Sequence, residues 1–409
     1  MIESIDFRLI GVSEKRVTID LSGKNLIITG ENGCGKTRLL RQLYNYLLSF
    51  SDNQLPNKEY IQHQLQNAQD KLTTLSPLLR EKSPFSEKVR SCLQQLDRAY
   101  SENMEISETD SIFELIKENQ FVIRFFEANR VSQISGGGQV ESISKLKGTG
   151  LLQDFKDDSS NLLEKYLVSY YNYGSHVIAR ENNPEEVQRI NAWFDKVQDD
   201  LRNLFEDPVL TLEYNPKEQA FYIIQQDKIP YRLSNLSSGY SSIMSIYADL
   251  LMKVELRDIP ADEITGFVLI DEIDAHLHVS IQRKIFAFFD KSFPKIQFIV
   301  TTHSPFVVQS VNDAIIYDLS KLETLEDLSM YSYESILKGL LGVDCTSDIL
   351  NKKLDEMATI VQQEPLNKDR LSELVDSIES HEAQLNPRSR AFLLLGKNAL
   401  LDSNDGEDV

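Results

Sequence analysis

The sequence contains few of the features that mark secreted and membrane proteins. Its three cysteines lie far apart and form no C-x-x-C pair, which excludes a disulfide framework and a cysteine-based zinc site. No apolar run reaches the roughly 18 residues of a membrane-spanning helix. The N-terminus, MIESIDFRLIGV, has acidic residues where a signal peptide needs a basic region. These absences predict a cytoplasmic protein with no membrane segment.

Positive charge is also scarce. The 409 residues carry a formal net charge of −20. Such a surface repels phosphates over most of its faces, which argues against tight, sequence-independent binding of nucleic acid by the whole body. A solvated acidic surface that keeps the chain in solution is the simpler interpretation, and it leaves room for a local basic groove. The length allows a sizeable core and two or three modules.

One short stretch organises the rest of the chain. Residues 25–37, NLIITGENGCGKT, place an apolar run before GENGCGKT, which fits G-x-x-x-x-G-K-[ST], and a helical pattern follows. The glycines of this P-loop let the backbone curl so that N–H groups and a helix N-terminus face phosphates. Lys36 is expected to pair with the β- and γ-phosphates, and the Thr37 hydroxyl to ligate Mg²⁺. The sequence thus predicts an ATP site made by Gly30, Asn32, Gly33, Gly35, Lys36, Thr37 and Arg38.

The pattern of apolar residues predicts an α/β fold. Residues 2–10 and 16–21 alternate apolar and polar side chains, as half-buried strands do. Further strands are expected at 25–29, 266–270, 296–302 and 313–317, with helices between the last three, including one at 279–291. Such alternation implies a parallel sheet covered by helices. The tetrapeptide NPKE at 215–218 predicts a hairpin between two more strands.

Four regions are expected along the chain. Residues 1–50 and 206–320 form the ATPase core. Residues 51–205 form a mainly helical insertion, with a core strand near 120–128 and a mobile glycine-rich loop at 131–149. Residues 321–409 show helical periodicity without clear strands, and they end in an acidic tail. An apolar stripe in this last region makes it a candidate for oligomerisation or effector docking; it comprises Ile336, Leu337, Leu340 and Leu341.

The second motif is FVLIDE at 267–272, an apolar run followed by two carboxylates. It fits a buried strand that delivers Asp271 to the magnesium ion beside Thr37. Glu272 can then orient and deprotonate the attacking water. An ordinary strand with surface acids is the alternative, and the P-loop in the same chain argues against it. We therefore expect Thr37 and Asp271 to bind Mg²⁺, and Glu272 to be catalytic.

Two shorter motifs complete the set. LSSGY at 236–240 places a Ser-Ser-Gly turn before a helix, and a helix N-terminus attracts anions; a simple helix cap is the alternative. His303, in IVTTHSP at 299–305, follows an expected strand, where its imidazole can hydrogen-bond a γ-phosphate. A purely structural histidine is the alternative. We expect His303 to act with Glu272 in catalysis.

In this order, GENGCGKT, LSSGY, FVLIDE, IDAHLH and TTHSP resemble the ABC-type ATPase family in its soluble branch, which includes SMC-like, DNA-repair and OLD-like proteins. The resemblance implies an ABC-ATPase head, with a β-layer and a parallel P-loop sheet flanked by helices. It also implies a head-to-tail homodimer, which closes on itself. ATP on one chain would then face Ser237, Ser238 and Gly239 of the other chain, and Asp274 would lie in the D-loop at the interface.

Some positions depart from the family pattern. Ser238 and Tyr240 replace residues of the transporter-style signature, which argues against a transporter ATPase. No clear glutamine marks the Q-loop, and Arg130 or Gln133 is the candidate for that place. The pair His276 and His278 has a spacing that suits a metal, but the resemblance places both in the D-loop, as interface or packing residues.

DEIDAHLH and FPKIQFIVTTHSPF resemble compact bacterial antiviral ATPases of Septu and retron-linked systems. The resemblance implies an ATPase that forms a dimer or a higher oligomer and regulates a separately encoded effector, with a nuclease expected. Nucleic acid would be reached through that effector or a local patch. The main alternative is a DNA-maintenance ATPase of the SMC or repair type. A self-contained nuclease is a further one, although residues 321–409 lack the strand-borne acidic cluster of a Toprim nuclease.

Overall fold

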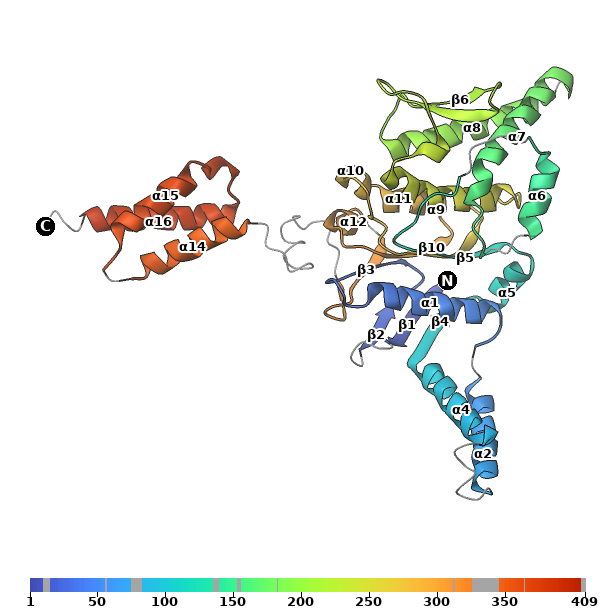
Figure 1. Ribbon diagram of the computed structural model, residues 1–409, viewed down its shortest axis with the longest axis horizontal. Coiled ribbons are helices and arrows are strands. Elements are labelled where there is room, and N and C mark those ends of the chain that lie inside the picture. Colours follow the sequence, from blue (N-terminus) through green and yellow to red (C-terminus); the bar gives the residue numbers. More distant parts are fainter. Residues whose placement is uncertain are drawn as a thin grey trace. The chain divides into compact units, whose positions relative to one another are not determined.

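The computed structural model of the protein describes residues 1–9, 15–55, 57–74, 83–134, 140–152, 156–181, 183–311, 313–325, 346–363 and 365–405. The chain divides into two compact units, Met1–Ile336 and Leu337–Val409. Each unit has its own helices and its own apolar core (Figure 1). The four regions expected from composition stay a prediction.

A six-stranded sheet with the order β12-β11-β3-β10-β9-β5 forms the centre of the first unit. Only β12 is antiparallel to its neighbour, and the other five strands run parallel. The bounds are β3 Asn25–Thr29, β5 Phe121–Phe126, β9 Thr265–Ile270, β10 Ile296–Thr301, β11 Ala314–Asp318 and β12 Glu323–Leu325. The expected α/β fold is therefore confirmed, although β12 places a short strand in the region expected to have none.

Helices cover both faces of this sheet, as a parallel sheet requires. Figure 1 shows α1 (Lys36–Ser51) on one face and α9 (Ser238–Glu255) and α11 (Ile285–Ser292) on the other. Every residue of α9 from Ser241 to Val254 is buried. A single helix was expected at 279–291, but the structure has two, α10 (Val279–Gln282) and α11. The short helix α12 (Pro305–Gln309) follows β10.

A second, antiparallel sheet packs on the far side of α1. Its order is β2-β1-β4, with bounds β1 Ile2–Arg8, β2 Arg16–Asp20 and β4 Glu102–Ile106. Its apolar side chains and those of α1 share one core with the central sheet. The strand β4 lies in the stretch expected to be a helical insertion, so that expectation was wrong here. Met104 faces the core from β4, and pairing with β1 supplies the hydrogen bonds of the strand.

Helices form most of the remaining first unit. They are α2 Lys58–Thr73, α4 Pro84–Ser101, α5 Thr109–Lys117, α6 Ile143–Leu152, α7 Leu163–His176 and α8 Pro184–Phe205. The expectation of a loop at 131–149 was wrong for its second half, because α6 begins at Ile143. Leu146 of α6 is buried and anchors this helix. Residues 135–139, with the glycine cluster, lie outside the described residues.

The expected hairpin is present. It consists of β6 (Thr211–Asn215) and β7 (Ala220–Ile224), and β8 (Tyr231–Arg232) extends it to three strands. Aromatic rings hold this sheet against α7 and α8: Tyr171 lies 4.5 Å from Tyr214 between ring centroids, and Phe194 lies 5.7 Å from Phe221. The sheet and these two helices lie above α9, the helix that begins within the LSSGY motif, in Figure 1.

The second unit is helical within its described residues. It contains α14 (Asp348–Val361), α15 (Lys368–Glu379) and α16 (Pro387–Asp405) around a small apolar core. The helix α16 includes the first residues of the expected acidic tail, whose last four lie outside the described residues. The stripe Ile336, Leu337, Leu340 and Leu341 also lies outside them. In the described part of the chain, no helix is both long and apolar enough to cross a membrane.

Candidate active site

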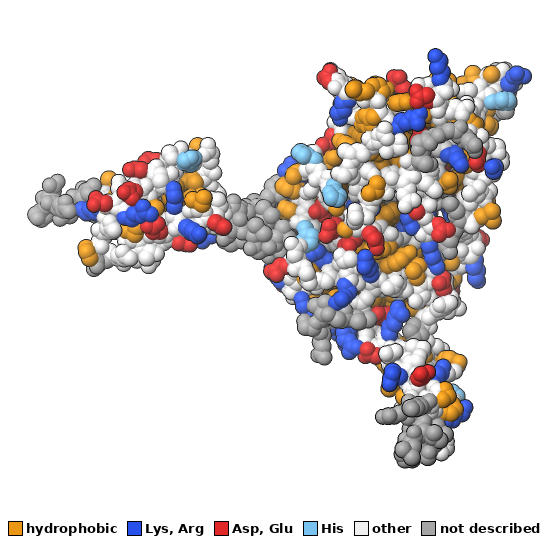
Figure 2. Space-filling model, viewed as in Figure 1, with side chains coloured by type: hydrophobic (Ala, Val, Ile, Leu, Met, Phe, Trp, Pro, Cys, Tyr) orange, Lys and Arg blue, Asp and Glu red, His pale blue; other side chains and the backbone are white. Residues whose placement is uncertain are grey.

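The sheet register brings the motifs to one edge. The pairs Ile28↔Thr301, Val300↔Ile270 and Ile270↔Phe126 align the carboxyl ends of β3, β10, β9 and β5. The P-loop follows β3, the acidic pair follows β9, and His303 follows β10. In an open α/β sheet, the crevice at the carboxyl ends of the strands is where ligands bind. On the face seen in Figure 2, histidine side chains gather beside α10 and α12, among acidic and basic side chains.

The P-loop has the backbone that its glycines permit. Gly30, Gly33 and Gly35 have φ values of 133°, 79° and 109°, which other residues rarely adopt. Gly30 also has no room for a side chain, since a Cβ would lie 2.7 Å from the Ser320 hydroxyl. That hydroxyl accepts a hydrogen bond of 2.7 Å from the backbone N–H of Glu31. Ser320, which the sequence did not single out, thus supports the loop from the end of β11.

Lys36 lies inside the curl of the loop. Its ammonium group donates to the carbonyl oxygens of Gly30 and Glu31, each at 2.9 Å. Burial lowers its pKa, and the charges of Cys34, Glu272 and Asp271 act against this shift. Phosphate oxygens would compensate the buried charge better than neutral carbonyls do. The other expected nucleotide contacts lie around it: Thr37 is half-buried, whereas Asn32, Gly33 and Arg38 are exposed.

The acidic pair is fixed by a threonine on the neighbouring strand. The Thr301 hydroxyl donates to Asp271 Oδ1 at 2.6 Å and accepts from the backbone N–H of Glu272 at 2.8 Å. Asp271 is 3% exposed. Glu272 is half-buried, and its φ of 46° lies in the left-handed region, which costs about 1–2 kcal/mol for a residue with a side chain.

The donor atoms at this edge suit magnesium. Mg²⁺ prefers hard oxygen ligands and commonly takes only one or two from protein, with substrate phosphates and water as the others. The Thr37 hydroxyl and the Asp271 carboxylate are oxygens of this kind, and Thr301 engages only one of the two Asp271 oxygens. The described residues hold no cluster of three or more His, Cys, Asp or Glu side chains that would bind a metal by itself. The residues therefore fit a Mg²⁺ ion that arrives with nucleotide.

Arg130 lies behind the acidic pair. Its guanidinium donates to the backbone carbonyls of Asp271 at 2.7 Å, Glu272 at 3.2 Å and Ile273 at 3.4 Å. Burial lowers the pKa of Arg130 to about 10, so it stays charged at neutral pH. Sequence reasoning named Arg130 as a candidate for the Q-loop position. In the structure, the Arg130 guanidinium contacts carbonyl oxygens. A cationic group cannot be a ligand of Mg²⁺.

His303 completes the edge. Burial and the neighbouring Lys36 lower its pKa below the ordinary value of 6.5, against the charges of Asp274, Glu272 and Asp271. A neutral imidazole carries one N–H that can donate a hydrogen bond. The adjacent Thr302 hydroxyl donates to Asp274 Oδ1, which joins the strand end that carries His303 to the turn after Glu272.

The signature motif begins α9. Ser237 is the N-cap residue, and Ser237 and Ser238 are exposed. Gly239 has no space for a Cβ, which would lie 2.6 Å from the carbonyl oxygen of His276. The signature therefore contacts the expected D-loop within one chain. In the part of the chain that the structure describes, no hydrogen bond or ion pair joins Ser237, Ser238 or Gly239 to the P-loop.

A family comparison agrees with these motifs. Residues 68–309, more than half of the chain, match the family described as "AAA domain, putative AbiEii toxin, Type IV TA system". The chain belongs to this AAA domain family. The matched range includes LSSGY, FVLIDE and TTHSP and begins after the P-loop.

Several bacterial proteins are similar in sequence to this AAA domain protein. The Septu protein PtuA of Bacillus thuringiensis is 26% identical over 344 residues, which cover 79% of this chain and 80% of the relative. PtuA of Bacillus mycoides is 29% identical over 47% of this chain, and the "Retron Ec83 probable ATPase" of Escherichia coli is 39% identical over 23%. The matches span only 28% and 18% of these last two relatives.

Among solved structures, an SMC head bound to the C-winged helix domain of ScpA is similar to this AAA domain protein. The similarity covers 80% of this chain and 94% of that structure, with 13% sequence identity and a TM-score of 0.37.

Proposed function

We propose that this AAA domain protein is an ATP-hydrolysing subunit of a bacterial anti-phage defence module. The observation that carries the proposal is the convergence of the P-loop, the acidic pair and His303 at one edge of a parallel sheet. The similarity to proteins named Septu PtuA and to a retron ATPase supports the defence role. The expected location is the cytoplasm.

Each side chain has a distinct part in the proposed hydrolysis. Mg²⁺, held by Thr37 and Asp271, would neutralise charge on the β- and γ-phosphates. Lys36 would exchange its two loop carbonyls for phosphate oxygens. Glu272 orients the attacking water and accepts its proton, and the neutral His303 donates its N–H to a γ-phosphate oxygen. These roles need an ATP molecule on the loop and a closed site around it.

A head-to-tail homodimer would close the site. Ser237 and Ser238 are exposed and make no bond to the P-loop of their own chain, so they are free to meet the nucleotide of a second copy. ATP then acts as the link between two copies. We propose that this dimer, alone or within a larger oligomer, regulates a separately encoded effector, and that the effector is a nuclease.

Two substitutions test the ATPase. Lys36→Ala should abolish ATP binding, because the buried cation for the phosphates is lost. Glu272→Gln should bind ATP, hydrolyse it at least about 100-fold more slowly, and accumulate as an ATP-bound dimer. Binding of labelled ATP, phosphate release and light scattering with and without ATP measure the three properties. Hydrolysis by Glu272→Gln at the wild-type rate would refute the catalytic assignment.

Purification of the native complex from its own host tests the defence role. A nuclease, reverse transcriptase or toxin retained at fixed stoichiometry supports the proposal and names the effector. A homo-oligomer alone, with ATP turnover stimulated by DNA, would favour a DNA-maintenance ATPase instead.

A further inference from the structure

The sequence motifs do not account for the hydrogen bonds of Arg130 at the candidate active site. Its guanidinium donates to four backbone carbonyls: Glu127 of its own segment at 3.0 Å, and Asp271, Glu272 and Ile273 of the turn after β9. Three consecutive carbonyls that point to one cation define the path of the backbone through that turn. Glu272, the middle residue, is the one with the left-handed φ of 46°.

The geometry points to Arg130 as a positioning residue for ATP hydrolysis, one that holds the Glu272 turn in its strained conformation so that the carboxylate faces the attacking water. This inference rests on the proposed ATPase activity. A left-handed glutamate is unfavourable unless its surroundings impose it. Thr301 holds the turn from the side of β10 through the N–H of Glu272, and Arg130 holds it from the side of β5 through the carbonyls.

The same segment also reaches the signature helix. Two residues after Arg130, the backbone N–H of Ser132 donates to the Ser241 hydroxyl at 2.9 Å. Ser241 lies in the first turn of α9, next to the signature. A short stretch of chain therefore connects the catalytic turn, through Arg130, to the helix that carries Ser237–Gly239. A change in the position of α9 on dimer closure would act on the Glu272 turn through this connection.

A role in positioning Glu272 and a place at the Q-loop, where a glutamine would ligate Mg²⁺, make different predictions for substitutions of Arg130. If Arg130 positions Glu272, Arg130→Met should lower kcat by about 100-fold, the cost of a misplaced catalytic group. ATP affinity and the Mg²⁺ concentration for half-maximal rate should stay as in the wild type. Arg130→Lys should recover part of kcat, because a lysine keeps the charge but cannot span several carbonyls. Arg130→Gln should resemble Arg130→Met.

Arg41→Met is the matched control. Arg41 also pairs with the Glu127 segment, through the Glu127 carboxylate at 3.0 Å, but its side chain is 57% exposed. Among the described residues, no hydrogen bond or ion pair joins Arg41 to the turn at Asp271–Ile273. The Arg41→Met variant should hydrolyse ATP at the wild-type rate. Steady-state phosphate release, binding of labelled ATP and magnesium titration are measured for every variant, together with the thermal melting temperature.

Each outcome decides the inference. Wild-type kcat in Arg130→Met would overturn it and leave the proposed ATPase intact. A tighter magnesium dependence with normal kcat in Arg130→Gln would also overturn it, in favour of a metal-ligand position. Where Arg130→Met does not fold, a folded Arg130→Lys decides: reduced kcat at unchanged ATP affinity supports the inference, and wild-type kcat contradicts it. Absence of hydrolysis in the wild type would instead count against the proposed function.

Discussion

At the scale of single residues, Gly239 shows how a missing side chain sets the distance between two functional segments. A Cβ on residue 239 would lie only 2.6 Å from the carbonyl oxygen of His276, which is too close for two atoms that are not bonded. His276 itself has a left-handed φ of 64°, so the turn that presents this carbonyl is also constrained. The signature and the expected D-loop therefore fit against each other only while residue 239 is a glycine.

We predict that Gly239→Ala displaces the signature from the D-loop. The free energy of unfolding should fall by about 1–3 kcal/mol, as for other overpacked sites, and ATP-dependent dimerisation should weaken. Urea unfolding and light scattering with ATP measure both. Gly148→Ala in α6 is the control, because a Cβ there meets no atom within 4 Å. It should raise the free energy of unfolding by about 0.5–1 kcal/mol, since alanine favours a helix over glycine, and leave dimerisation as in the wild type. Equal behaviour of the two variants would refute the packing argument.

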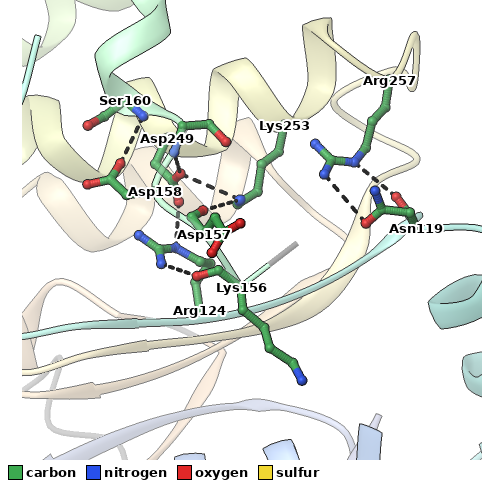
Figure 3. Close-up of polar contacts among 10 residues, drawn as sticks. Asn119, Arg124, Lys156, Asp157, Asp158, Ser160, Asp249, Lys253 and Arg257 are labelled. Atoms are coloured by element: carbon green, nitrogen blue, oxygen red, sulfur yellow. Dashed lines mark hydrogen bonds and ion pairs between the residues drawn. The ribbon is translucent and has the colours of Figure 1, made fainter. Parts of the chain in front are cut away.

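At the scale of elements, a buried charge cluster joins β5 to α9. Figure 3 shows Arg124 of β5 and Lys253 of α9 on either side of Asp249, with the segment from Lys156 to Ser160 beside them. Arg124 donates to Asp249 at 2.8 Å, and Lys253 donates to the carbonyl oxygen of Asp157 at 2.8 Å. Asp249 and Lys253 are fully buried. The cluster fixes the signature helix to the strand that leads to Arg130.

The burial of Lys253 predicts a dependence of stability on pH. Burial lowers its pKa to about 8, whereas the unfolded chain keeps the ordinary value near 10.4. Between these values the unfolded state binds more protons, so the free energy of unfolding should rise with pH, by up to about 1.4 kcal/mol per pH unit from this group. Below pH 8 both states are protonated and the contribution is flat.

Urea unfolding of the wild type and of Lys253→Met at several pH values from 7 to 10 measures this effect. Asp249 keeps Arg124 and the backbone N–H of Ser159 as partners in the variant. The difference in stability between the two proteins removes contributions from other titrating groups, the buried tyrosines included. Parallel curves over this range would show that Lys253 is not the cause.

The elements that apolar runs define could be predicted from the sequence. The strands β3, β9, β10 and β11 appear close to where they were expected, because runs such as FVLI and IQFIV leave few alternatives. The strand β4 could not be predicted in this way. Its sequence, ENMEI, has one buried apolar residue, Met104, and its buried Glu102 pairs with Arg98 of the preceding helix. Pairing with β1, nearly 100 residues earlier in the chain, makes it a strand.

The site could be predicted only in part. The motifs predicted that the P-loop, the acidic pair and His303 follow strands that end at one edge of a parallel sheet, and the sheet has this arrangement. Their roles in catalysis stay predictions. Arg130 and Ser320 act through backbone atoms of distant segments, and a backbone contact leaves no motif in a single sequence.

At the scale of the whole molecule, the second unit has an apolar core of its own. The core of the second unit consists of residues from α14, α15, α16 and the turns between them, and Leu371 is at its centre with no exposed surface. Every described residue of this core lies in the second unit, so that unit's own helices pack it.

We predict that Leu371→Ala lowers the free energy of unfolding of the second unit by about 2–5 kcal/mol and leaves ATP hydrolysis unchanged. Leu395→Ala, at a side chain that is 56% exposed, is the control and should affect neither. Hydrogen exchange of the full chain, resolved by peptide, reports the two units separately, and phosphate release reports the ATPase. Loss of hydrolysis in Leu371→Ala with a protected first unit would show that the second unit takes part in the reaction.

The contact between Ser320 and the P-loop connects the candidate nucleotide site to the segment that follows β11. The Ser320 hydroxyl accepts the N–H of Glu31, and the carbonyl oxygen of the same residue accepts from Lys36. From Ser320 the chain continues through β12 toward the second unit. If ATP binds to the loop as proposed, a change in the loop reaches Ser320, just after β11, through this hydrogen bond.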